Sequence, residues 1–141
     1  MKILTMGEVM IQLNPINSGP LRHVHVFEKH VAGSEGNVAI GLSRLGNNVS
    51  IVSSVGDDEF GKNVMSVLRS ENVDVKHVLI DPHHPTGVYF IQRNFPFPNS
   101  IEVYYYRINS AMTHFPPSYV NHIDLDNYEF STFPESLLCL V

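Results

Sequence analysis

Two short segments contain residues whose types and spacing suit the binding of a small polar molecule. The first is the run Tyr104–Arg107, which ends a predicted strand. Because successive side chains alternate across a strand, Tyr105 and Arg107 share one face. A phenol hydroxyl beside a guanidinium can hold a carboxylate, since arginine offers a planar fork of N–H donors. An edge strand with paired aromatic side chains and a solvated arginine fits the same pattern, so the residues alone leave both interpretations open.

The second segment, Gly33–Asn37, opens a predicted helix. Backbone N–H groups at a helix N-terminus suit an anion or a sugar hydroxyl. No Gly-Lys-Ser/Thr follows and the spacing is not Gly-x-Gly-x-x-Gly, which excludes the two common nucleotide-binding loops. A tight turn that needs the conformational freedom of glycine is the other interpretation.

Histidine and cysteine give no comparable pattern. The eight histidines contain no helical His-x-x-x-His pair and no Glu-x-x-His, so we expect no metal site and interpret them as surface residues. The single cysteine, Cys139, excludes an internal disulfide and a cysteine-based zinc site. It lies in an apolar segment without an activating partner, so we do not expect it to be a nucleophile.

Composition narrows the class of protein. Of the 141 residues, 43% are hydrophobic and 16% are charged, which is typical of one folded domain and not of a disordered chain. The formal net charge is -5 and no basic stripe is present, which argues against a nucleic-acid partner. The N-terminus lacks the apolar core of a signal peptide, and no apolar run approaches the ~18 residues of a membrane span. We therefore expect a soluble, cytoplasmic protein without a membrane partner.

Hydrophobic periodicity predicts alternating strands and helices. Strands are expected near residues 2–6, 9–13, 23–28, 49–55, 77–80, 88–93 and 101–107. This alternation predicts a βαβ arrangement with a mainly parallel sheet, and the hairpin over residues 88–107 adds a smaller sheet.

Each predicted helix has its own end signals and apolar face. In the first helix, Ser34 is the expected cap, Gly46 the left-handed end, and the buried face is Val38, Leu42 and Leu45. In the second helix, Asp57 is the expected cap, Asn72 the end, and the buried stripe is Phe60, Val64, Val67 and Leu68.

Three motifs, in this order, resemble those of the ribokinase-like (PfkB) carbohydrate kinases. They are Met6-Gly7-Glu8, then Gly33-x-x-x-Asn37-x-Ala39 ahead of Leu42-x-x-Leu45-Gly46, and then Val55-Gly56-Asp57-Asp58-x-Phe60-Gly61. Within that family, Thr86-Gly87-Val88-Tyr89 and Tyr105-Tyr106-Arg107 are similar to the 2-keto-3-deoxygluconate kinases. The resemblance extends over residues 1–129, and we expect residues 130–141 to form an atypical tail.

The resemblance implies a fold, a reaction and a set of contacts. The fold is a partial three-layer αβα domain with a small β-sheet lid, and the lid strands are an expected surface for homo-oligomers. The reaction transfers the γ-phosphoryl group of ATP, with Mg²⁺, to the 6-hydroxyl of 2-keto-3-deoxygluconate or its galactonate epimer. The implied substrate contacts are Gly33, Tyr89, Tyr105 and Arg107, with Ser34 and Asn37 bordering the same pocket. A ribokinase- or fructokinase-type enzyme is the alternative within the family.

The sequence also departs from the family pattern. The family's Gly-Ala-Gly-Asp motif, which supplies an anion hole and the catalytic base, is absent because no glycine follows Gly87. We therefore assign no catalytic residue, no nucleotide site and no metal ligand to this chain, and expect it to be inactive alone. A truncated or frameshifted product is the favoured interpretation, and a sequencing error in a full-length gene is the alternative.

Two other functions compete with a kinase fragment. One is a non-catalytic module that binds a sugar acid, dimerises, or pairs with a separately encoded C-terminal half. The other is an unrelated small nucleotide-binding domain, which the missing phosphate loop disfavours.

Overall fold

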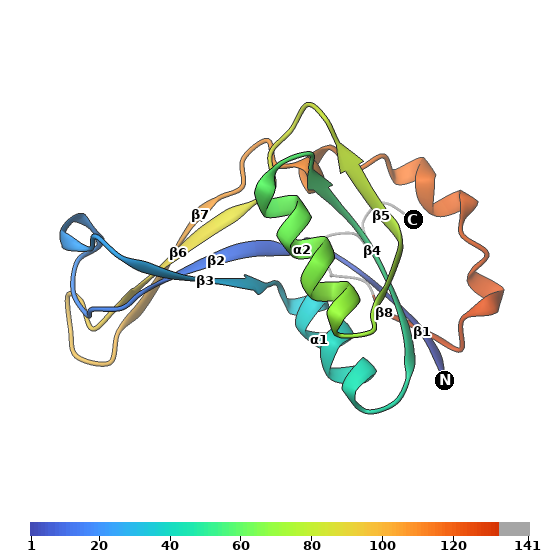
Figure 1. Ribbon diagram of the computed structural model, residues 1–141, viewed down its shortest axis with the longest axis horizontal. Helices are drawn as coiled ribbons and strands as arrows, with labels where there is room; N and C mark the ends of the chain where they lie inside the picture. Colours follow the sequence, from blue (N-terminus) through green and yellow to red (C-terminus); the bar gives the residue numbers. More distant parts are fainter. Residues whose placement is uncertain (133–141) are drawn as a thin grey trace.

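The computed structural model describes residues 1–132, whose strands form two separate four-stranded sheets (Figure 1). Strands of the first sheet are all parallel, in the order β5 (Asp74–Asp81), β4 (Asn48–Gly56), β1 (Lys2–Met6) and β8 (Phe130–Thr132). The second, mixed sheet has the order β3 (Phe27–Ala32), β2 (Met10–Pro15), β6 (Val88–Arg93) and β7 (Ile101–Tyr106). The predicted parallel sheet and the hairpin of the smaller sheet are therefore confirmed.

Two α-helices and four 3-10 turns complete the described chain. The helices are α1 (Ser34–Arg44) and α2 (Glu59–Ser70), and the turns are η1 (Leu21–His23), η2 (Ala111–His114), η3 (Pro117–His122) and η4 (Leu125–Asn127). With 11 and 12 residues, neither helix is long and apolar enough to cross a membrane.

The parallel sheet is covered on both faces, and its central strands β1 and β4 are buried along almost their whole length. One face packs against the two helices, through a core that includes Ile3, Val49, Ile51, Ala39, Val64 and Leu68. The other face packs against the η2–η4 segment, through Leu4, Met6, Val52, Phe115 and Ile123. Within the described residues, the layers are therefore helices, sheet and 3-10 turns.

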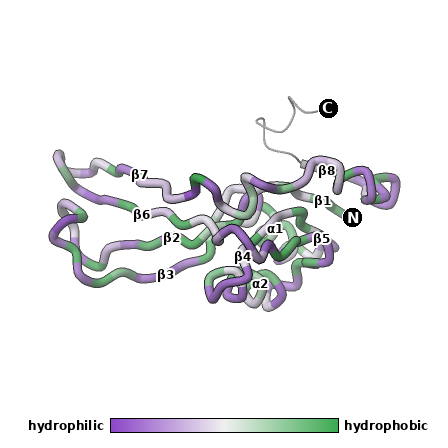
Figure 2. The backbone as a smooth tube through the Cα atoms, turned by 90° about the horizontal axis from the view of Figure 1, so that it is seen from above, coloured by the Kyte–Doolittle hydropathy of each residue, from purple (hydrophilic) through white to green (hydrophobic). Residues whose placement is uncertain are grey.

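The small sheet projects from the end of this core as a long twisted ribbon (Figures 1 and 2). Tyr89 of β6 lies directly opposite Tyr105 of β7 in the antiparallel register. Every residue of β7 is exposed to solvent, including Ile101 and Val103. This sheet is therefore held to the core at one end, while its faces remain largely open.

The strand expected over residues 23–28 is wrong. Leu21–His23 form a 3-10 turn, and β3 begins only at Phe27, where the chain comes opposite Pro15 of β2. The position of β3 is set by its pairing with β2 and not by the local alternation of histidine and valine.

The cap expected for α1 is also wrong, and of its expected apolar face only Leu42, which is half-buried and packs against the core, is confirmed. Ser34 donates its hydroxyl to Glu35 Oε2 at 3.0 Å, and the N-cap is Gly33 without a side-chain hydrogen bond. Val38 is 43% and Leu45 79% exposed, while the fully buried positions are Gly36 and Ala39. Small residues are buried here because the helix closely approaches the segment between β1 and β2: a Cβ on Gly36 would lie 3.2 Å from a methyl group of Val9.

In α2 the cap lies one residue later than expected, at Asp58 and not Asp57. Asp58 Oδ1 accepts from the backbone N–H of Gly61 at 2.7 Å and from the Thr86 hydroxyl at 2.9 Å, and Oδ2 accepts from the Thr86 N–H at 2.9 Å. The Thr86 hydroxyl in turn accepts from the N–H of Gly56 at 3.0 Å. Asp58 thus joins the start of α2 to the segment that leads into β6.

The remaining features of the helices agree in part with expectation. Val64 and Leu68 are buried and Val67 is half-buried, whereas Phe60 is 37% exposed and Met65 takes its place in the stripe. Gly46 and Asn72 follow the two helices with φ angles of 85° and 57°, as predicted for left-handed ends. Phe130–Thr132, the start of the expected atypical tail, pair with β1 as β8, whereas Cys139 lies outside the described residues.

Replacing Asp58 is expected to destabilise the fold, whereas replacing Asp57 is not. Asp58→Ala should lower the free energy of unfolding by about 2 kcal/mol, because it removes an N-cap and leaves Thr86 without its acceptor. Asp57→Ala, an exposed neighbour, should change it by less than about 0.5 kcal/mol. Urea denaturation at pH 7 measures both values, and a larger loss in Asp57→Ala would place the cap at the earlier residue.

The stabilisation that Asp58 contributes is expected to depend on pH. Burial raises the pKa of Asp58, but the hydrogen bonds from Thr86 and Gly61 outweigh it, so the pKa lies below its ordinary value of 3.8. The stabilisation is therefore present above pH 3.8 and is lost as the pH falls through the lowered pKa. The difference in stability between the parent chain and Asp58→Ala should narrow only below that pH.

Gly33 is expected to reject any side chain, because its φ angle is 144° and an added Cβ would lie 2.4 Å from the carbonyl oxygen of Glu8. Gly33→Ala should destabilise the chain by about 1–3 kcal/mol through backbone strain. Gly41→Ala is the matched control, because Gly41 lies in the same helix with open space around it. That substitution should stabilise the chain by about 0.5–1 kcal/mol, and thermal unfolding separates the opposite signs.

Candidate functional site

A cleft of about 760 Å³ lies where the chain passes from the carboxyl end of β1 into the small sheet. Open parallel sheets bind ligands at this end of their strands. The cleft is lined by Gly7, Glu8, Met10, Gly33, Ser34, Glu35, Asn37, Tyr89, Tyr105, Arg107, Met112, Thr113, Phe115 and Pro117. All six residues that the sequence singles out for substrate contact are therefore brought together, although they come from three different elements and their flanks.

Tyr89, Tyr105 and Arg107 form one wall of the cleft. The two phenol rings lie 5.5 Å apart between centroids and are tilted by 40°. The guanidinium carbon of Arg107 lies 6.0 Å from the centre of the Tyr105 ring, within the range of a cation–π contact. The predicted sharing of one strand face by Tyr105 and Arg107 is confirmed, and Tyr106 points to the other face, where its ring meets Phe90.

The Tyr89 hydroxyl is held by its own partner within the small sheet. It donates to the side-chain oxygen of Gln12, whose amide group donates to Asn14 Oδ1 at 2.7 Å. Burial, together with the neighbouring Tyr105, raises the pKa of Tyr89, so the phenol stays protonated at neutral pH. Tyr89 therefore offers the cleft an aromatic ring of fixed orientation.

The opposite wall is the first turn of α1. Gly33 lies at its N-cap, and the first N–H groups of a helix have no partner within it. Asn37 is exposed at the rim, and its backbone N–H closes the first helical hydrogen bond, to the Gly33 carbonyl oxygen at 2.8 Å. This wall offers hydrogen-bond donors suited to hydroxyl or carbonyl oxygens.

Glu8 is a site residue that sequence reasoning did not single out. Its side chain is 7% exposed, and Arg107 Nε lies 3.0 Å from Oε2. The Ser110 hydroxyl donates to Oε1 at 2.6 Å. The sequence held one signal for it, namely an acidic residue that directly follows Gly7 at the carboxyl end of a buried strand.

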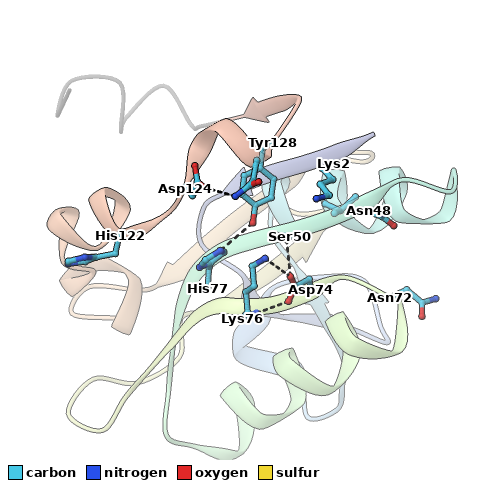
Figure 3. Close-up of a pocket in the computed structure, with 12 residues that line it drawn as sticks. Lys2, Asn48, Ser50, Asn72, Asp74, Lys76, His77, His122, Asp124 and Tyr128 are labelled. Carbon is cyan, nitrogen blue, oxygen red and sulfur yellow. Dashed lines mark hydrogen bonds and ion pairs between the residues drawn. The ribbon is translucent and has the colours of Figure 1, made fainter.

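A second cavity, of about 660 Å³, lies at the opposite, amino ends of the parallel strands (Figure 3). Its polar groups are largely paired with one another. Asp74 Oδ2 lies 3.2 Å from Lys76 Nζ and accepts from the Ser50 hydroxyl at 3.1 Å, and the Tyr128 hydroxyl lies 3.3 Å from His77 Nε2. These contacts satisfy the local charges and hydrogen-bonding groups, so the first cleft is the better candidate for ligand binding.

Residues 1–132 show no group of three histidine, cysteine, aspartate or glutamate side chains that could hold a metal ion. The nearest approach to such a group is His84, whose Nδ1 lies 2.7 Å from Asp81 Oδ2 and whose ring stacks on His114 at 3.6 Å.

Comparison with known proteins gives consistent matches. The chain matches the pfkB family carbohydrate kinases over residues 1–133. It is 49% identical over 119 residues to the 2-dehydro-3-deoxygluconokinase of Thermoproteus tenax, covering 84% of this chain and 37% of that protein. It is 38% identical over 109 residues to the 2-dehydro-3-deoxygluconokinase of Bacillus subtilis, covering 77% of this chain and 33% of the relative.

The solved structures agree with these matches. The crystal structure of a sugar kinase from Pyrococcus horikoshii superposes with a TM-score of 0.84 at 33% identity, covering 98% of this chain and 44% of that one. The same protein has also been solved in complex with ATP. The chain thus spans less than half the length of these relatives. Because the family match covers nearly all of its residues, the chain belongs to the pfkB family of carbohydrate kinases.

Proposed function

We propose that the cleft binds 2-keto-3-deoxygluconate (2-dehydro-3-deoxygluconate), or its galactonate epimer, and that the chain provides the sugar-acid site of an ATP-dependent kinase. The observation that carries the proposal is the wall formed by Tyr89, Tyr105 and Arg107. The names of the relatives from Thermoproteus tenax and Bacillus subtilis support the same class of substrate.

Arg107 is suited to the carboxylate end of this substrate. A guanidinium has five N–H donors, and Glu8 faces Nε, so the two terminal nitrogens remain for a ligand. The Arg107 side chain is 47% exposed, which leaves it accessible from the cleft. Two parallel N–H···O bonds to a carboxylate are stronger and more directional than a single contact.

The other end of the substrate is a chain of hydroxyl groups, which suits the opposite wall. We assign its contacts to the backbone around Gly33, to Ser34 and to the Asn37 side chain, with the rings of Tyr89 and Tyr105 packing against the carbon skeleton. Groups of this kind fix the orientation of a polar ligand, while the aromatic surface contributes burial.

The proposal gives residues 1–132 a binding role and no role in proton abstraction. A general base must be free to accept the proton of the attacking hydroxyl. In this cleft the carboxylate of Glu8 already faces Ser110 and Arg107, and that of Glu35 accepts from the Ser34 hydroxyl. ATP, Mg²⁺ and the base would therefore engage residues other than those described, either in the same polypeptide or in a separately encoded C-terminal half.

Association of two copies through the small sheet is a second proposal, favoured by the exposed apolar side chains of β7. Ile101 is 67% and Val103 40% exposed on the strand face that also carries Tyr105. Sedimentation velocity should show a dimer for the parent chain and a monomer for Val103→Asp. A parent chain that stays monomeric at high micromolar concentration would contradict this second proposal.

Arg107→Ala is expected to weaken the binding of the sugar acid about ten- to a hundredfold, since a charge-assisted contact contributes ~1.5–3 kcal/mol. The matched ligand is 3-deoxyfructose, in which a hydroxymethyl group replaces the carboxylate, and its affinity should change little. Arg93→Ala is the matched control, because Arg93 is exposed on β6 and does not line the cleft.

Isothermal titration calorimetry of the three chains with both ligands measures these affinities. Equal losses for the acid and the neutral sugar would show that Arg107 does not recognise the carboxylate. A parent chain that binds neither ligand, or binds both equally, would overturn the proposed substrate class.

A further inference from the structure

All four strands of the small sheet meet the core beside one residue, Glu8. The residue itself precedes β2. A Cβ added to Gly33, which follows β3, would lie 2.4 Å from the carbonyl oxygen of Glu8. Its carboxylate lies 2.5 Å from the position of a Cβ on Gly87, before β6. Arg107, after β7, forms the ion pair with Oε2. Figure 1 shows these strands leaving the core side by side.

The two oxygens of this carboxylate have different surroundings. Oε1 accepts the hydroxyl of Ser110, a residue that is 1% exposed. Oε2 is fully enclosed and accepts no hydrogen bond from any described residue. The Arg107 guanidinium, at 3.0 Å, is therefore what compensates the charge on Oε2. A carboxylate removed from water needs such a partner, because an uncompensated buried charge is strongly destabilising.

We propose that Glu8 is a positioning residue, whose carboxylate fixes the Arg107 guanidinium at Nε so that its two terminal nitrogens face the cleft. The junction of the two sheets fixes Glu8 in turn, so the orientation of Arg107 depends on how the small sheet sits on the core. The identity of the ligand rests on the proposed function above, whereas the contact between Glu8 and Arg107 does not.

A positioning role and a purely electrostatic role predict opposite changes in the affinity for the sugar acid when the Glu8 carboxylate is removed. If Glu8 acted only through its negative charge, removing that charge would strengthen the binding of an anionic ligand beside it. If Glu8 positions Arg107, losing the contact releases a long side chain, which must then be ordered again when the ligand binds. The two roles therefore predict opposite changes in the affinity for the sugar acid.

Glu8→Met and Glu8→Gln separate the two roles. Methionine nearly preserves the volume but accepts no strong hydrogen bond. Glutamine can turn its oxygen toward Arg107 and its amide N–H toward the Ser110 hydroxyl, which also serves as an acceptor. We expect Glu8→Met to weaken the binding of 2-keto-3-deoxygluconate by about tenfold, and Glu8→Gln to weaken it less, because the glutamine oxygen keeps a partial negative charge beside the guanidinium.

Glu28→Gln is the matched control. It removes one negative charge from the small sheet, at an exposed position whose carboxylate lies 3.8 Å from His30 Nε2. Its affinity for the sugar acid should equal that of the parent chain. A gain in affinity in both Glu8→Met and Glu8→Gln, measured by calorimetry, would overturn the positioning role and leave only the effect of charge.

A second readout needs no ligand. The ¹⁵N relaxation of Arg107 Nε, assigned by the loss of its signal in Arg107→Ala, reports how rigidly the guanidinium is held. In the parent chain the Arg107 Nε group should be as rigid as the backbone, while that of the exposed Arg93 should be mobile. In Glu8→Met the Arg107 Nε group should become as mobile as that of Arg93. If Glu8→Met does not fold, the parent chain still decides, because an Arg107 signal as mobile as that of Arg93 would refute the inference.

The two readouts also distinguish failure of this inference from failure of the proposed function. A parent chain that binds no sugar acid but shows a rigid Arg107 signal would overturn the substrate and keep the positioning role. A parent chain that binds the sugar acid but shows a mobile Arg107 signal would overturn the positioning role and keep the proposed substrate.

Discussion

The ion pair between the buried Glu8 carboxylate and the half-exposed Arg107 is the contact on which the geometry of the cleft depends. The base of the small sheet is also joined to the hydrophobic core, through Ile11 of β2 and the neighbouring Val31 and Val88, whereas β7 is exposed throughout. Asp58 provides the second anchor, through its two hydrogen bonds to Thr86, in the segment that leads into β6. Both anchors are carboxylates at the ends of elements, where backbone and side-chain donors converge.

These anchors explain how strands of the small sheet can form one wall of the cleft while the first turn of α1, which packs on the other sheet, forms the opposite wall. Tyr89 and Tyr105 are fixed relative to each other by the register of β6 and β7. Gly33 is fixed to the core by its approach to the backbone of Glu8. Because Glu8 contacts Gly33 on one side and Arg107 on the other, the distance between the two walls depends on one residue and its immediate neighbours.

The sequence predicts this architecture where local patterns decide it, and misses it where contacts distant in the chain decide it. The hairpin of β6 and β7 follows from alternation and turn residues, and the shared face of Tyr105 and Arg107 follows from strand geometry. Two adjacent aspartates precede α2, and only the contact with Thr86, 28 residues further along, selects Asp58 as the cap. For Glu8 the local signal is only its place after Gly7 at the end of a buried strand, and its partner Ser110 lies 102 residues away.

The buried face of α1 shows a second limit of local patterns. Val38 and Leu45 have the spacing of an apolar face, yet both are exposed, because the helix turns its small residues Gly36 and Ala39 toward Val9 and the sheet. Close approach of a helix to a sheet selects for small side chains, which a search for large apolar residues does not find. That close approach also brings the N-terminus of α1 to the cleft, so the packing of the helix against the core determines where this wall of the cleft lies.

The charges around the cleft indicate how a sugar acid would be selected. Arg107 contributes one positive charge, while Glu8 and Glu35 contribute two negative ones, and the whole chain carries a formal net charge of -5. Long-range attraction therefore does not favour anions here, and salt screens such forces beyond about 10 Å in any case. Recognition would have to come from short-range contacts, in which the carboxylate meets the terminal nitrogens of a guanidinium already fixed at Nε. A site of this kind discriminates by geometry, since an anion that cannot reach Arg107 meets only the neighbouring carboxylates.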